Sequence, residues 1–276
     1  SIEGPNSALA PEKIRGVSEN LALTTELGQE ILRIRATDLG NIHIEEKKVE
    51  LNIKEIGQFV KSIYETKHDI IPVMIGGDHF CTYPVVKEIG NNLVKKEDFG
   101  ILIFDSHLDL YDEWDKGTYS HATIARRIFD LDYINKDNLL IAGCRDIDLP
   151  ELKFAREQNI TFLNAHELSE QTLSEYSERI HQFFLNREVK KIYISIDIDA
   201  LDPSIAPATG FAIPGGFSYR QLWQILRNTC SNFEVIGFDV VEVAPNMDLP
   251  NNITSNVAAK LIVEVMSFIS RRKENL

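Results

Sequence analysis

Residues 100–109 read GILIFDSHLD, an apolar run that ends in side chains of the kind that bind metal ions. Gly100–Phe104 is apolar at consecutive positions, which predicts a strand buried on both faces. Asp105, His107 and Asp109 follow at alternate positions, so in an extended segment they would point to one side. The stretch therefore predicts a buried strand whose carboxyl end carries either a polar turn or one wall of a metal site.

Short apolar runs alternate with longer segments of helical period along the rest of the chain. Strands are predicted at 71–75, 100–104, 139–143, 160–163, 192–196 and 235–241. Helices are predicted at 11–36, 53–67, 82–90, 121–131, 149–158, 172–187, 218–229 and 254–272. Strands that are apolar on both faces and separated by helices indicate βα units. We therefore expect a single α/β domain over residues 1–276, a three-layer α/β/α fold with a central, mostly parallel sheet and ligands at the carboxyl ends of its strands.

The composition of the 276-residue chain disfavours several classes of protein. A formal net charge of −13 argues against nucleic acid and anionic membranes as partners, because both are bound through clustered Lys and Arg. No apolar stretch approaches the roughly 18–20 residues of a membrane span. The cysteines, Cys81, Cys144 and Cys230, are widely spaced and odd in number, which disfavours a disulfide framework. We expect a cytoplasmic protein that binds neither nucleic acid nor membranes.

Side chains that can bind metal ions lie at or just after the ends of four of the predicted strands. In chain order they are Gly76-Gly77-Asp78-His79, Asp105-Ser106-His107-Leu108-Asp109, Asp197-Ile198-Asp199, and Asp239 with Glu242. If the sheet is parallel, all four groups lie on the same edge, where carboxylates ~4 Å apart repel by several kcal/mol unless protons or cations neutralise them. Two divalent ions bridged by shared carboxylates would do so, and mixed imidazole and carboxylate ligands suit Mn²⁺. Each group alone also fits a polar turn, but together they favour the metal site.

The chain resembles the ureohydrolase (arginase/agmatinase) family in four motifs. They are GGDH at 76–79, FDSHLD at 104–109, SIDIDALDP at 195–203 and GFDVVEVAP at 237–245. Gly4-Pro5, Ala10-Pro11 and Ile14-Arg15 are similar to an early GP…P..IR stretch of the family. The resemblance implies the arginase-like fold and a homo-oligomer, a trimer or hexamer. It also implies that the family's first strand precedes Gly4, so we expect roughly thirty residues upstream of Ser1.

The resemblance further implies two Mn²⁺ ions in each subunit. The implied ligands are His79, Asp105, His107, Asp109, Asp197 and Asp199. Asp105 and Asp197 would bridge the ions, with His79 and Asp109 completing one site and His107 and Asp199 the other. Two cations would lower the pKa of a shared water, which would then attack the carbon of a guanidinium group.

Catalytic roles are implied for His121, Glu242 and Asp109. His121 matches the family histidine that gives a proton to the leaving amine, since imidazole titrates in the right range; its alternative role is to cap the following helix. Glu242 matches the acid that pairs with the guanidinium, because a carboxylate accepts two parallel N–H bonds from that planar cation. The remaining acids near the motifs, expected to orient the ligand loops, are Asp78, Asp202 and Asp239.

The stretch 116–121, KGTYSH, is similar to the F-S-H-G pattern of agmatinases and lacks the Asn-rich stretch with which arginases receive an α-carboxylate. We therefore expect a small cationic guanidino substrate, agmatine, to be converted to putrescine and urea. Residues 209–216 depart from the agmatinase pattern T-G-T-P-E-P-G-G, Phe80 stands where Ser is usual, and Ala122 replaces a Gly. The residues expected to contact the substrate are Glu242, His121, Thr209 and Phe211.

Other functions remain open at this point. Another ureohydrolase activity, as guanidinobutyrase, arginase or formimidoylglutamase, would use the same ligands. A two-metal phosphoesterase would need Arg126, Arg127 or Arg145 to clamp a phosphate, although none of them lies in a ligand motif. A non-catalytic metal-binding homologue would be expected to lack a ligand, whereas every expected ligand is present.

Overall fold

The computed structural model describes residues 6–45, 48–66, 70–92, 99–115 and 117–274, with side chains up to residue 272. A 6-stranded sheet with the order β1-β6-β5-β2-β3-β4 forms its centre. The strands are β1 (Val73–Ile75), β2 (Phe99–Phe104), β3 (Leu139–Cys144), β4 (Thr161–Asn164), β5 (Lys191–Asp197) and β6 (Glu234–Val241). All pairings between these strands are parallel, so their carboxyl ends share one edge. The predicted strands are confirmed, with small shifts of their bounds.

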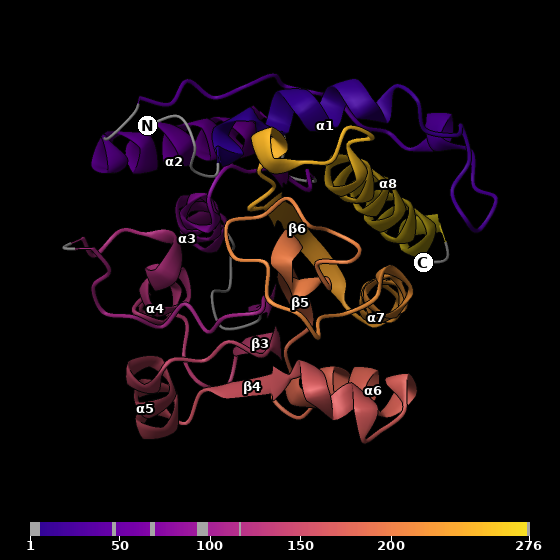
Figure 1. Ribbon diagram of the computed structural model, residues 1–276. Coiled ribbons are helices and arrows are strands. Elements are labelled where there is room, and N and C mark those ends of the chain that lie inside the picture. The colour runs from indigo at the N-terminus through magenta and orange to yellow at the C-terminus, as the bar shows by residue number, and fades with distance from the viewer. Residues whose placement is uncertain (1–5, 46–47, 67–69, 93–98, 116, 275–276) are drawn as a thin grey trace.

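Helices cover both faces of the sheet and make the predicted three-layer fold (Figure 1). One layer contains α2 (Val49–Thr66), α3 (Thr82–Asn92), α4 (Ile124–Phe129) and α5 (Leu149–Gln158). The other contains α6 (Leu173–Leu185), α7 (Tyr219–Asn232) and α8 (Ile253–Glu274), with α1 (Ala10–Ser18) packed on α8. Alternate residues of β2 enter the two cores: Ile101 and Ile103 face the first layer, Leu102 and Phe104 the second. This alternation explains why the strand is apolar at every position.

The predicted helix over 11–36 is wrong beyond Ser18, where α1 ends. The chain turns at Gly28, whose φ of 74° suits glycine, and Thr25 and Gln29 are joined by a backbone hydrogen bond of 2.9 Å. Glu26 N donates to the buried carboxylate of Glu264 on α8. Tertiary contacts with α8 thus replace helical hydrogen bonds. Gly4 and Pro5, which contribute to the family resemblance, lie outside the described residues.

Helix α8 corrects the expectation that no stretch approaches a membrane span. Its segment Ile253–Arg272 is long and apolar enough to cross a membrane by length and composition, yet 61% of its most apolar window is buried inside the protein. The helix packs on α1 and α7, and its fully buried Glu264 also accepts a hydrogen bond from Trp223 Nε1 at 3.1 Å. These contacts are those of a core helix.

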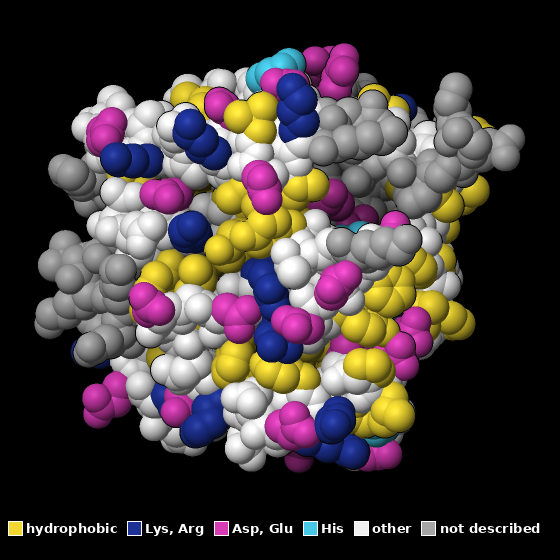
Figure 2. Space-filling model, turned by 90° about the vertical axis from the view of Figure 1, so that its left-hand side faces the viewer, with side chains coloured by type: hydrophobic (Ala, Val, Ile, Leu, Met, Phe, Trp, Pro, Cys, Tyr) yellow, Lys and Arg dark blue, Asp and Glu magenta, His cyan; other side chains and the backbone are white. Residues whose placement is uncertain are grey.

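The surface over the α2–α5 layer mixes charges of both signs (Figure 2). On this face Lys and Arg side chains are interspersed with Asp and Glu and with areas of hydrophobic side chains. A protein that binds a polyanion gathers its basic side chains into a patch. The described part of this face presents no such patch.

Candidate active site

The predicted metal ligands come from neighbouring strand ends at the carboxyl edge of the sheet. Asp105 directly follows β2, and Asp197 is the last residue of β5. His79 opens a short 3-10 turn after β1, and Glu242 directly follows β6. Because β1, β6, β5 and β2 are consecutive neighbours in the sheet, these side chains meet at one place.

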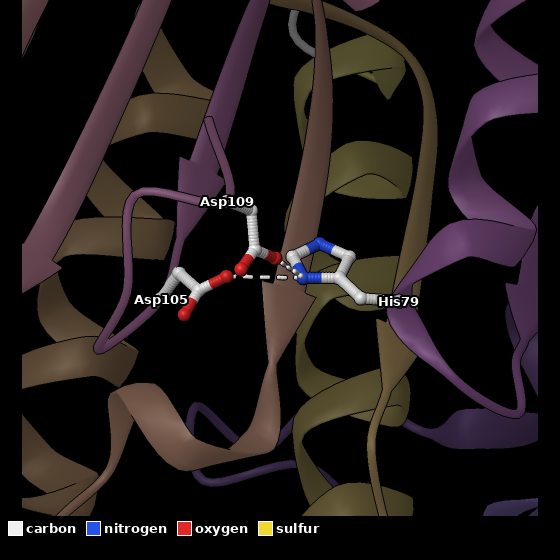
Figure 3. Close-up of side chains that lie close together, drawn as sticks. All are labelled: His79, Asp105 and Asp109. Carbon is white, nitrogen blue, oxygen red and sulfur yellow. Dashed lines mark ion pairs between the residues drawn. The ribbon is translucent and has the colours of Figure 1, made fainter. Parts of the chain in front are cut away.

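His79 lies at the centre of a first group of side chains (Figure 3). Its Nδ1 atom is 3.0 Å from Asp105 Oδ2 and 3.2 Å from Asp109 Oδ2, and the figure shows both carboxylates pointing toward the imidazole. Asp197 Oδ2 is 3.3 Å from the same nitrogen. One imidazole nitrogen and three carboxylates therefore converge on a small volume.

A second group shares Asp105 with the first. His107 Nδ1 is 3.3 Å from Asp105 Oδ1 and 3.2 Å from Asp199 Oδ2. The ligand-type atoms of His79, Asp105 and Asp109 lie within 4.8 Å of one another, as do those of Asp105, His107 and Asp199. These two groups could each hold a metal ion, with Asp105 between them. The two groups contain the predicted pairs, His79 with Asp109 and His107 with Asp199, around Asp105. The predicted bridging by Asp197 is not part of either group.

Turns, rather than an extended segment, make the side chains converge. His107 N donates to Asp105 Oδ1 at 2.7 Å, and Asp199 N donates to Asp197 Oδ1 at 2.8 Å. In each case a carboxylate accepts a hydrogen bond from the backbone two residues later, which holds the chain in a turn. Asp109 has a φ of 51°, a left-handed conformation that is uncommon outside glycine. The predicted convergence is thus correct, but the reason given for it, alternation along an extended chain, is wrong.

Unbalanced charge and unpaired polar atoms show that the residues fit metal ions. His79 Nδ1 and Asp105 Oδ2 are buried 3.0 Å apart, yet in the described structure neither atom forms a hydrogen bond of acceptable geometry. Burial raises the pKa of Asp109 to about 8, and the neighbouring Asp105 carboxylate adds to this effect. Burial opposes a charge on His107, but Asp105 and Asp199 outweigh it and raise its pKa to about 12. In the absence of cations the cluster must therefore retain protons, which divalent ions would displace.

A buried hydrogen-bond chain fixes the ring of His79 from behind. Its Nε2 atom is 3.0 Å from Ser195 Oγ, which donates to Asp239 Oδ1 at 2.6 Å. Asp239 Oδ2 also accepts from Tyr193 OH at 2.6 Å and from Thr82 Oγ1 at 2.9 Å. This chain leaves Nδ1 to face the carboxylates. The orienting role expected for Asp239 has this geometric basis. Ser195 was not predicted as a site residue, although it opens the SIDIDALDP motif and places a hydroxyl in an apolar strand.

The cluster opens into a pocket that also holds the other predicted site residues. The pocket is lined by His79, His107, Asp109, His121, Asp197, Asp199, Thr209, Gly210, Phe211 and Glu242. Asp105 alone among the predicted site residues does not line it and lies 1% exposed beneath. Phe211 is half exposed, and its ring lies 5.7 Å from that of His107 and 6.1 Å from that of His121.

Glu242 and His121 are both partly buried in the pocket wall. Glu242 has a φ of 61°, and its Oε1 accepts a hydrogen bond of 2.7 Å from His79 N. Burial raises the pKa of Glu242 to about 8, and the neighbouring carboxylate of Asp78 adds to this effect. Burial lowers the pKa of His121. The helix-cap alternative for His121 is not observed, because the capping side chain is that of Ser120.

The arginines considered as phosphate clamps are engaged elsewhere. Arg126 and Arg127 both pair with Asp112 and Asp130 on the protein surface. Arg145 directs its guanidinium at backbone carbonyls, among them that of Asp199 at 2.6 Å. The described residues that line the pocket include neither Lys nor Arg. This arrangement disfavours a phosphoesterase, which would need a cation at the reacting phosphate.

Comparison with known proteins identifies the family. A sequence model of the arginase family matches residues 2–267. The chain belongs to the arginase family. Arginase 1, mitochondrial, of Oryza sativa subsp. indica is 35% identical over 280 residues, which cover 98% of this chain and 78% of that protein.

Solved structures of arginase-family fold agree with the architecture but differ in the activity that they name. The agmatine ureohydrolase of Thermoplasma volcanium superposes with a TM-score of 0.84 at 27% identity, covering 98% of this chain and 85% of that one. The formimidoylglutamase of Bacillus subtilis subsp. subtilis str. 168 gives a TM-score of 0.88 at 25% identity, covering 98% and 83%. The predicted fold and family are therefore confirmed, and the substrate has to be argued from the pocket.

Proposed function

We propose that this arginase-family hydrolase uses two Mn²⁺ ions to convert agmatine and water into putrescine and urea. One observation carries the proposal: the His and Asp cluster opens into the same pocket as His121 and Glu242. A centre that only stored metal would need the cluster alone. The pocket adds a proton donor and a carboxylate for a cation, which a hydrolytic reaction on a guanidinium requires.

The two groups that share Asp105 would hold the ions. One consists of His79, Asp105 and Asp109, and the other of Asp105, His107 and Asp199. Asp197, which lies beside His79 and accepts a hydrogen bond from Asp199 N, would contribute to both. When bound, two such ions would supply a water of lowered pKa that is nucleophilic near neutral pH. The donor set of imidazoles and carboxylates, without a thiolate, suits Mn²⁺.

The side chains around the ions have separate tasks. Glu242 receives two N–H groups of the guanidinium, whose positive charge favours the ionised carboxylate. Asp109, at the pocket wall, accepts the proton of the attacking water at its carboxylate. His121 gives a proton to the nitrogen of the departing amine. Because burial lowers the pKa of His121, its protonated form is a stronger acid than an exposed imidazolium.

The charges around the pocket favour agmatine over substrates that carry a carboxylate. Arginine, guanidinobutyrate and formimidoylglutamate each carry one, and Lys and Arg are the side chains that bind a carboxylate most strongly. The described lining residues provide neither, and Lys116 lies outside the described residues. Carboxylates are present instead: Asp78 is exposed beside His79, and Asp146 Oδ2 lies 3.7 Å from His107 Nε2. The second cation of agmatine would be attracted to them.

A substrate panel tests the proposal. Purified protein loaded with Mn²⁺ would be given agmatine, arginine and guanidinobutyrate with assay of urea, and formimidoylglutamate with assay of glutamate. We expect agmatine to have the highest kcat/KM, by about tenfold or more, since one unpaired charge in the pocket costs this much. A higher kcat/KM for arginine would overturn the choice of substrate. The absence of product from every compound would overturn the enzyme itself.

A further inference from the structure

The guanidinium of Arg145 connects two segments that meet at the pocket. Arg145 directly follows β3. Its Nη2 atom donates to the carbonyl of Asp199 at 2.6 Å and to the carbonyl of Ile213 at 2.8 Å. Its Nε atom donates to the same Ile213 carbonyl at 3.0 Å, and Nη2 also reaches Leu201 O at 3.2 Å. One side chain thus holds the turn of a metal-ligand residue and the loop that carries Phe211.

The backbone of Arg145 is itself attached to the metal centre. Arg145 N donates to Ser106 O at 2.8 Å, and Ser106 N donates to Asp199 Oδ1 at 3.0 Å. The backbone of Arg145 is therefore fixed to Ser106, which lies between the metal-ligand residues Asp105 and His107 in the chain. Arginine presents its donors in a planar fork, so it can bond to separate carbonyls at once, which a single ammonium group on a flexible stem cannot do in the same geometry.

The loop from 209 to 216 depends on this side chain at its middle. The chain just before it is fixed where Ala208 N donates to Thr254 Oγ1 at 3.0 Å, and its end is fixed where Gly215 N donates to Asp202 Oδ2 at 2.7 Å. Between these points, among the described residues, the hydrogen bonds to 210–214 come from Arg145. Two residues before Ile213, Phe211 places its ring beside His107 and His121.

We propose that Arg145 is a positioning residue for substrate binding: its fork holds the Phe211 loop in register with the metal centre. From the sequence alone, the role open to Arg145 was that of a phosphate clamp. The kinetic part of this inference rests on the proposed function, because it concerns how agmatine is bound. Loss of the fork should loosen the loop and raise KM, while the metal ligands, which are held by strands and by Ser106, keep their ions.

The test compares Arg145→Lys and Arg145→Gln with wild type and with Arg187→Lys. Arg187 is a matched control, since it is also partly buried and donates to a backbone carbonyl, that of Phe183 at 2.9 Å, at the amino edge of the sheet. Hydrogen exchange is measured for peptides covering 209–217, with Mn²⁺ content, Tm and agmatine kinetics. For both Arg145 variants we expect exchange about tenfold faster there and KM about tenfold higher, with kcat within about threefold and Mn²⁺ content unchanged.

The outcomes separate this inference from the proposed function. If Arg145→Lys leaves both the exchange of 209–217 and KM at wild-type values, the fork is not a tether and the inference is wrong. A fall in Mn²⁺ content and kcat with an unchanged KM would also overturn it, because Arg145 would then support the metal centre. If wild type releases no urea at all, the proposed function fails, and the exchange rates alone decide: faster exchange supports the tether, and unchanged exchange overturns it.

Discussion

The metal cluster and the 209–216 loop border the same pocket, but the protein builds them in different ways. His79, Asp105, Asp197 and Asp199 are at most 3% exposed and sit directly on strand ends or on turns attached to them. Phe211 is 50% exposed and belongs to a segment without regular structure. The comparison teaches that the sheet fixes the groups proposed to carry out the chemistry, whereas the residue proposed to meet the rest of the substrate lies on a loop outside the sheet.

The largest effect should come from the residue that both metal groups share. In Asp105→Ala the carboxylate between the two imidazoles is lost, so we expect metal binding and turnover to disappear together, with kcat/KM falling about four orders of magnitude or more. Metal analysis and urea assay measure both. The control Asp137→Ala changes an exposed carboxylate near the amino ends of the strands, away from the cluster, and should behave as wild type. Turnover that survives full metal loss would contradict the account.

His121 should separate proton transfer from metal binding. We expect His121→Ala to lower kcat about 100- to 1,000-fold, because a proton donor for the leaving amine is removed. Its two-metal content should not change, since its ring is not among the groups that could bind the ions. Steady-state kinetics and metal analysis on one preparation suffice. A variant that retains full kcat would show that His121 is not the acid.

The buried chain behind His79 should tune the metal affinity. In Ser195→Ala the ring loses its Nε2 partner, and we expect the dissociation constant for Mn²⁺ to rise about 10- to 100-fold. Calorimetric titration of metal-free protein measures it. Ser177→Ala removes an equally buried hydroxyl, on α6 and bonded to Asn228, and should leave the affinity unchanged. Equal affinities for the two variants would remove Ser195 from the account.

The protonated cluster should make the metal-free protein less stable as pH rises. Burial raises the pKa of Asp109 to about 8, and Asp105 and Asp199 outweigh burial to raise that of His107 to about 12. The folded state therefore binds more protons than the unfolded state, from about pH 4 to 8 for Asp109 and from about 6.5 to 12 for His107.

This excess of protons sets the sign of the pH dependence. The stability contributed by Asp109 and His107 is fully present below their unfolded pKa values, and between the unfolded and folded values it falls by about 1.4 kcal/mol per pH unit for each proton held only by the fold. Urea denaturation between about pH 5 and 8 should show the fall in metal-free protein and a much weaker one with Mn²⁺ bound. A metal-free protein that becomes more stable over this range would refute the charge balance proposed for the cluster.

The smallest effect should come from the loop. In Phe211→Ala the ring beside His107 and His121 is lost, and we expect KM for agmatine to rise about three- to tenfold with metal affinity unchanged. Leu149→Ala, a 73% exposed apolar residue at the start of α5, is the control. A weaker metal affinity in Phe211→Ala would erase the distinction between cluster and loop.

The strands and the ligand residues could be predicted from sequence because both are encoded locally. A run such as Ile192–Ile196 is apolar on both faces, and the ligands follow within a few residues at positions that the parallel sheet brings together. The helix predicted beyond Ser18 failed because contacts with Glu264, far along the chain, decide that segment. The prediction also missed that α8 is apolar and long enough to span a membrane. Its composition is that of a membrane span, and only its burial in the fold shows that it is a core helix.

Two parts of the site that escaped prediction, Ser106 and the tether made by Arg145, act through backbone groups. Nothing in the sequence assigned Ser106 a role in the site, yet its N–H donates to Asp199 Oδ1 and its carbonyl accepts a hydrogen bond from Arg145 N. Arg145 in turn bonds to carbonyls that every residue possesses, so no residue type at the other end reveals the contact. Such partners become visible only when the fold places them side by side.

The central claim is that the cluster shared by Asp105 is a two-metal centre, and metal stoichiometry tests it most directly. Metal-free protein would be equilibrated with Mn²⁺, freed of unbound ions and analysed for metal per chain. The account predicts two ions per chain for wild type. A protein that retains no metal under these conditions, with its fold intact, would contradict it.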